Sequence, residues 1–146
     1  MSLKHSAFYG DFSEEGKLSA LLTKQIGEFV PADWTVLEQW EKSRNADFAA
    51  LDEVTRNVYL KEKRDFSKSL LEMFYLEIRK YRDWAQVYYL RSCLAVRRGD
   101  REKALEYWKR ISQIRNYLYD DIGIIPLLAG ASADVTQLRA VENMLD

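Results

Sequence analysis

The chain contains very few of the residues that build turns. Glycine occurs six times and proline twice in 146 residues. A β-sheet fold needs many turns, which are made largely by these residues, whereas a fold of long helices needs few. The scarcity therefore predicts an all-α fold. Hydrophobic residues make up 47% of the chain, which is enough to form a core.

Apolar residues recur at helical spacing along most of the chain. After an N-terminal arm over residues 1–12, we expect one domain over residues 13–146. Its expected helices cover 13–30, 33–45, 47 to the charged stretch 61–64, 65–81, 84–98, 100–118 and 132–145. The pattern predicts an antiparallel bundle of about six to seven helices.

Breaking and capping residues set these expected boundaries. Pro31 is expected to end the first helix, and the Arg-Asp pair at 82–83 to form a tight corner. The Gly-Asp pair at 99–100 should end one helix and cap the next. The apolar segment 122–130 is interrupted by glycine and proline, so we expect a buried loop there.

Residues 84–111 resemble a tetratricopeptide-type helical hairpin. The resemblance lies in large, small and turn residues in the order that such a hairpin uses, namely Tyr88, Ser92, Gly99-Asp100, Ala104, Trp108 and Ile111. Small residues let antiparallel helices approach closely, and large ones fill the groove between them. The match covers about one repeat. It departs from the family at Arg91, which replaces an apolar residue, and no second copy occurs at the usual period of about 34 residues.

The resemblance implies a protein–protein interaction module, such as an adaptor, chaperone-like or regulatory domain. Its groove would be lined by the helix 84–98, and the groove-facing residues would be Gln86, Tyr89, Cys93 and Val96. These residues lack the Lys and Asn set with which some family members hold a C-terminal carboxylate. They favour an extended peptide or a partner helix, bound through aromatic and apolar contacts.

The residue types that common catalytic and metal sites need are scarce. His5 is the only histidine and belongs to the expected arm, which argues against His-dependent triads and metal sites. Cys93 is expected to be a buried, inert thiol, although Arg97 could supply the cation that a reactive thiol needs. Glycine-rich phosphate loops and cysteine clusters are missing from the sequence. We therefore predict no enzymatic activity, no catalytic residues, no cofactor and no metal.

Positive charge is concentrated in residues 79–115, which hold eleven Lys or Arg and four Asp or Glu, a net charge of +7. Aromatic residues alternate with these cations, a combination that suits an acidic peptide or a nucleic acid. Arg97, Arg98 and Arg101 surround the expected turn and form the predicted patch. Alternatively, the cations pair with acidic helices of the same domain. The sequence pI of 5.9 weakens the nucleic-acid interpretation, because nucleic-acid-binding domains usually exceed about 9.

Two rival functions follow from the same residues. One is a nucleic-acid-binding helical domain that uses residues 79–115. The other is a helical small-ligand binder with a site enclosed by aromatic side chains, namely Trp34, Trp40, Trp84 and Trp108. A single cysteine and the lack of a signal-peptide pattern predict a cytoplasmic location without a membrane partner.

Overall fold

The computed structural model describes residues 8, 10–12, 18–57, 67, 69–119 and 124–145. Within these ranges the chain is all-α, as predicted, with five α-helices, two 3-10 helices and no strand. The 3-10 helices are η1 (Ser19–Thr23) and η2 (Ile26–Glu28). The α-helices are α1 (Pro31–Ser43), α2 (Asn45–Val54), α3 (Leu70–Arg97), α4 (Arg101–Tyr119) and α5 (Ile124–Leu145).

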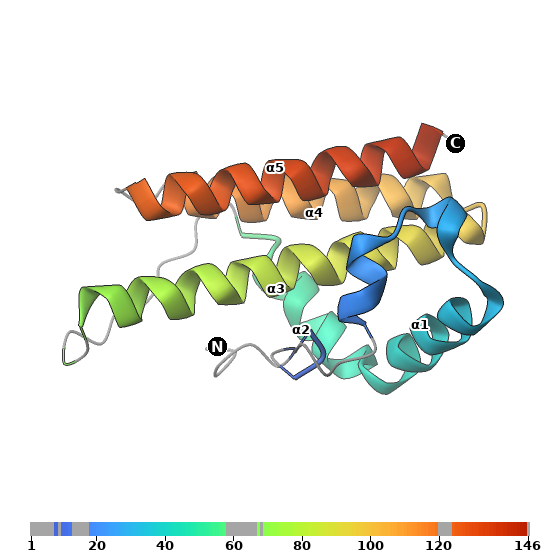
Figure 1. Cartoon of the computed structure of the whole chain (residues 1–146), viewed down its shortest axis with the longest axis horizontal. Helices are drawn as coiled ribbons and strands as arrows, with labels where there is room; N and C mark the ends of the chain where they lie inside the picture. The colour runs from blue at the N-terminus through green and yellow to red at the C-terminus, as the bar shows by residue number, and fades with distance from the viewer. Residues whose placement is uncertain are drawn as a thin grey trace.

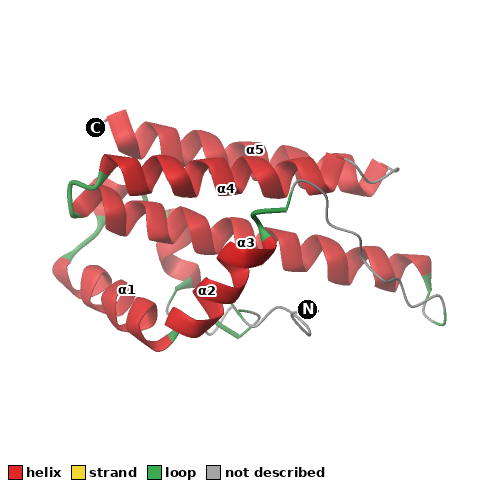
Figure 2. Cartoon of the chain, turned by 180° about the vertical axis from the view of Figure 1, so that it is seen from behind, coloured by secondary structure: helices red, strands yellow, loops and turns green. Residues whose placement is uncertain are grey.

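Helices α3, α4 and α5 form the main bundle, and α1 and α2 lie on the side of α3 away from α5 (Figure 1). The start of α4 and the end of α5 lie at the same end of this bundle (Figure 1). Seen from behind, α1 lies below α3, and α2 runs upward in front of the middle of α3 (Figure 2). None of the helices in the described ranges is long and apolar enough to cross a lipid bilayer.

The predicted helix over 13–30 is wrong for residues 18–30, which form η1 and η2 instead. Lys24 and Gln25 are extended and separate the two short helices. Pro31 does not end a helix but begins α1, because a first-turn residue needs no backbone N–H. The Asp33 carboxylate accepts a hydrogen bond from the Val30 backbone N–H at 3.0 Å and so stabilises this helix start.

The corner predicted at residues 82–83 is also wrong, because α3 runs through it as one helix of 28 residues. The apolar positions before and after residues 82–83 do not continue one helical stripe, and this break in the pattern has a simple cause. Between Tyr81 and Ala95 nearly every side chain is buried, so apolar residues occur around the whole helix and form no single stripe. Neither glycine nor proline interrupts this stretch.

Helix α5 replaces both the predicted loop over 122–130 and the short helix over 132–145 for the residues that are described. Pro126 is its third residue. Proline is tolerated in a first turn, since the N–H groups there have no partner within the helix. The fusion of two expected helices into α3, together with the loss of a helix over 18–30, leaves five α-helices in the described ranges instead of six to seven.

The predicted turn between α3 and α4 is confirmed. Gly99 has a φ of 73°, a conformation that suits glycine, and the Asp100 N–H donates to the Ala95 carbonyl at 2.9 Å. The Asp100 carboxylate then accepts a hydrogen bond from the Lys103 N–H at 3.0 Å, which caps α4. These contacts fix the two helices as an antiparallel hairpin.

Candidate interaction surface

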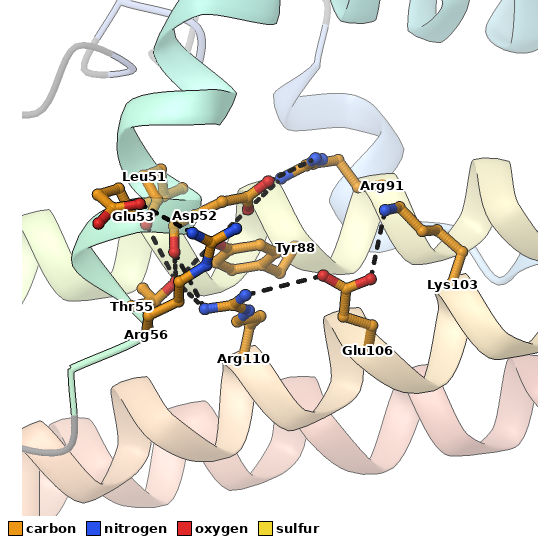
Figure 3. Close-up of polar contacts among 10 residues, drawn as sticks. All are labelled: Leu51, Asp52, Glu53, Thr55, Arg56, Tyr88, Arg91, Lys103, Glu106 and Arg110. Carbon is orange, nitrogen blue, oxygen red and sulfur yellow. Dashed lines mark hydrogen bonds and ion pairs between the residues drawn. The ribbon is translucent and has the colours of Figure 1, made fainter.

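An ion pair between the partly buried Asp52 and the buried Arg91 joins α2 to α3. Arg91 donates two hydrogen bonds to the Asp52 carboxylate, at 2.8 and 3.2 Å, and the Tyr88 hydroxyl donates a third at 2.7 Å. Arg110 of α4 donates to the Asp52 carbonyl at 3.0 Å and to the Thr55 hydroxyl at 3.2 Å. Figure 3 shows Asp52 and Thr55 facing Tyr88, Arg91 and Arg110. We call these five residues the polar clamp.

Aromatic rings enclose the Arg91 guanidinium. Its central carbon lies 4.6 Å from the centre of the Phe48 ring and 4.4 Å from that of Tyr107. The Arg91 side chain is only 8% exposed. Arg91 departs from the repeat pattern because it pairs with a carboxylate on another helix. It is therefore not part of an exposed basic surface.

The electrostatics of Asp52 indicate a structural role. Burial acts to raise the pKa of this carboxyl, but hydrogen bonds from Arg91 and Tyr88 outweigh it and hold the pKa below its ordinary value. Burial raises the pKa of the Tyr88 hydroxyl well above its ordinary value. Asp52 therefore stays ionised and Tyr88 protonated near neutral pH, which suits a fixed ion pair better than proton transfer.

The residues predicted to line a groove lie against other parts of the chain. Tyr89 and Cys93 are buried, while Gln86 and Val96 are partly buried. Asn143 of α5 donates a hydrogen bond to the Tyr89 hydroxyl at 3.2 Å and contacts the Cys93 sulfur at 3.6 Å. A partner would reach Tyr89 and Cys93 only if α5 moved away.

The Cys93 thiol should react only when the bundle unfolds. The side chain is fully buried, and burial raises its pKa to about 12, so little thiolate forms at neutral pH. We expect modification by a disulfide reagent at pH 8 to be far slower in the native chain than in the urea-unfolded chain. Native-state modification as fast as that of the unfolded chain would contradict this burial.

The three arginines predicted as a patch differ in their contacts. Arg98 makes a two-pronged ion pair with Glu41 of α1, at 3.1 and 2.6 Å. The Arg97 guanidinium lies 4.4 Å from the centre of the Trp34 ring, also on α1. Arg101 is exposed. Two of the three therefore attach α1 to the end of α3, the intramolecular alternative that the sequence left open.

Two more cations of the basic segment 79–115 also form ion pairs within the chain. Lys103 and Arg110 both pair with Glu106. Among the other cations of residues 79–115, Arg82, Arg101 and Lys109 are exposed and have no ion pair, and elsewhere in the described ranges the same holds for Lys42 and Arg139. Ion pairs within the chain thus occupy part of the basic segment, whereas a nucleic-acid backbone usually requires several phosphate contacts.

Three of the four tryptophans pack against different aromatic partners. Trp40 contacts Phe48 and donates to Asp11 at 3.0 Å, Trp34 packs on Phe29, and Trp84 packs on Tyr81. None of the ring contacts among described residues joins two tryptophans.

Metal ligands are similarly dispersed. Across the described ranges, no three His, Cys, Asp or Glu side chains are grouped to hold a metal ion. His5 lies outside the described residues.

Helix α5 has an unusual distribution of side chains. It buries Gln137 and Asn143, whereas Val135, Leu138 and Leu145 are 52%, 63% and 82% exposed. Gln137 donates to the Ser112 hydroxyl and accepts from Arg115, so polar contacts hold α5 to α4. We call Val135, Leu138 and Leu145 the outer face of α5. Over residues 135–145, α5 therefore buries these two polar side chains beside Ala140, and it exposes three apolar side chains beside Arg139 and Glu142.

Comparisons of the chain with protein-family models, curated proteins and solved structures found no significant match. The resemblance of residues 84–111 to a tetratricopeptide hairpin therefore remains a prediction.

Proposed function

We propose that this chain is a protein–protein interaction module that binds its partner through the outer face of α5. The observation that carries the proposal is the exposure of Val135, Leu138 and Leu145 on a helix that buries Gln137 and Asn143. Exposed apolar side chains that lie together on one helix face are typical of interaction sites. In a helical repeat array, an end helix with an apolar outer face needs a covering partner.

The position of α5 supports this assignment over the groove of the sequence-based prediction. Tyr89 and Cys93 already contact α5 within the chain, whereas the outer face of α5, on the opposite side of that helix, is available to a partner. Leu105, near the start of α4, is 44% exposed. The start of α4 and the end of α5 lie at the same end of the bundle (Figure 1).

A site-specific crosslinker tests the proposal. A photoreactive amino acid replaces Leu138 on α5 or, as the control, Glu53, which is exposed on α2. We expect covalent protein adducts in the source cell from position 138 and few from position 53. Mass spectrometry identifies the adduct, and the purified partner is then titrated with the chain.

Leu138→Asp should weaken that complex at least about tenfold, because it places a charge in an apolar contact. Ala49→Asp, which adds the same charge on α2, should leave the affinity unchanged. Equal crosslinking from positions 138 and 53, or equal affinities of the two variants, would refute the proposal.

A further inference from the structure

We infer that the outer face of α5 binds the same face of a second copy of this chain, with the two α5 helices antiparallel. This inference rests on the proposed function and names the partner. It is carried by the spacing of the exposed residues and by the charges beside them.

The exposed residues follow the spacing of a helix–helix seam. Val135, Leu138, Glu142 and Leu145 are separated by three, four and three residues, the repeat that keeps a stripe facing a neighbouring helix. All four are exposed. Three of them are apolar, and Glu142 is the one charged residue in the stripe.

This spacing is self-complementary when two copies run antiparallel. A two-fold axis level with residue 140 places Val135 of each copy opposite Leu145 of the other. The same axis places Leu138 of each copy opposite Glu142 of the other. Each contact occurs twice, as a two-fold interface requires.

The same arrangement brings the charges on α5 together: Arg139 of each copy approaches both Glu142 and Arg139 of the other. Arg139 and Glu142 are both exposed, and Arg139 follows Leu138 directly. When Leu138 lies opposite Glu142 of the second copy, Arg139 lies beside that carboxylate on the same flank of the seam. Two equivalent Arg139–Glu142 ion pairs then flank the apolar contacts and neutralise the glutamate in the stripe. Arg139 can also keep its hydrogen bond to the Leu22 carbonyl, since a guanidinium has five N–H donors.

Sedimentation equilibrium of the purified chain, over a wide range of concentration, tests the inference. We expect a monomer–dimer equilibrium. Leu138→Asp should raise the dissociation constant at least about tenfold with little change in the melting temperature, because Leu138 is mostly exposed. Ala49→Asp is the matched control and should dimerise like the wild-type chain. A monomer at every concentration, or a dimer that Leu138→Asp leaves intact, would overturn the inference.

A charge exchange tests the antiparallel arrangement. Arg139→Glu and Glu142→Arg should each weaken the dimer, and the double variant should restore it, because the exchanged residues still meet as opposite charges. Thermal melts of each variant check that the monomer stays folded. A double variant weaker than either single variant would refute this pairing.

The same measurement separates this inference from the proposed function. A chain that is monomeric alone, but crosslinks from position 138 to a different protein, would keep the proposed function and reject the second copy as the partner. A chain that yields no adduct from position 138 would reject both.

Discussion

We expect Asp52→Ala to lower the free energy of unfolding by about 3 kcal/mol. The substitution removes the carboxylate that accepts two hydrogen bonds from Arg91 and one from Tyr88. It leaves the Arg91 charge buried between Phe48 and Tyr107 without its counter-ion. Chemical denaturation followed by circular dichroism measures the difference.

Glu53→Ala is the matched control. Glu53 is the next residue of α2, but it forms an exposed ion pair with Arg56, and such pairs contribute at most about 1 kcal/mol. Similar losses for Asp52→Ala and Glu53→Ala would show that the polar clamp does not hold α2.

The Asp52 contribution should also depend on pH. The pKa of Asp52 is lower in the folded chain than its ordinary value, which applies in the unfolded chain. The stabilisation is therefore present above the unfolded-state pKa of about 4 and is lost as the pH falls from there through the folded-state pKa. The stability difference between the wild-type chain and Asp52→Ala should accordingly shrink on acidification below about pH 4.

Ala104→Leu should lower the free energy of unfolding by about 2 kcal/mol. Ala104 of α4 and Ser92 of α3 are both fully buried, and the sequence predicts that they meet at a close crossing of the two helices. Three added carbon atoms at such a crossing force the helices apart or strain the neighbouring side chains.

Lys109→Leu is the control for the added leucine, because Lys109 is an exposed residue in the middle of the same helix. Its melting temperature should stay close to that of the wild-type chain. An unchanged melt of Ala104→Leu would mean that α3 and α4 do not cross closely at Ala104.

The turn residues of this sequence predicted local structure well where backbone chemistry decides the outcome. Gly99 and Asp100 end α3 and cap α4 as expected, since a positive φ and a capping carboxylate are local requirements. The corner at 82–83 failed for a different reason. Helical periodicity reports burial, and α3 is buried on several sides, so a change of stripe did not mark a change of helix.

The candidate site was harder to predict because one sequence pattern is compatible with two different structures. Val135, Leu138 and Leu145 form a helical apolar stripe, and such a stripe can face a core or a partner. Only the position of α5 shows that its buried side carries Gln137 and Asn143. The pairing of Arg91 with Asp52 was equally hidden, since the two residues are 39 apart and on different helices.

The polar clamp also affects the order in which parts of the chain gain structure. Helices α3, α4 and α5 follow one another in sequence and pack together, so short loops close their contacts at a small cost in chain entropy. The hydrogen bonds that hold α2 and its C-cap Thr55 to α3 and α4 connect residues 33 to 63 positions apart. We therefore expect folding to begin in the bundle and α1 and α2 to dock afterwards, so that their amides lose protection from hydrogen exchange before those of α3 when the chain is destabilised.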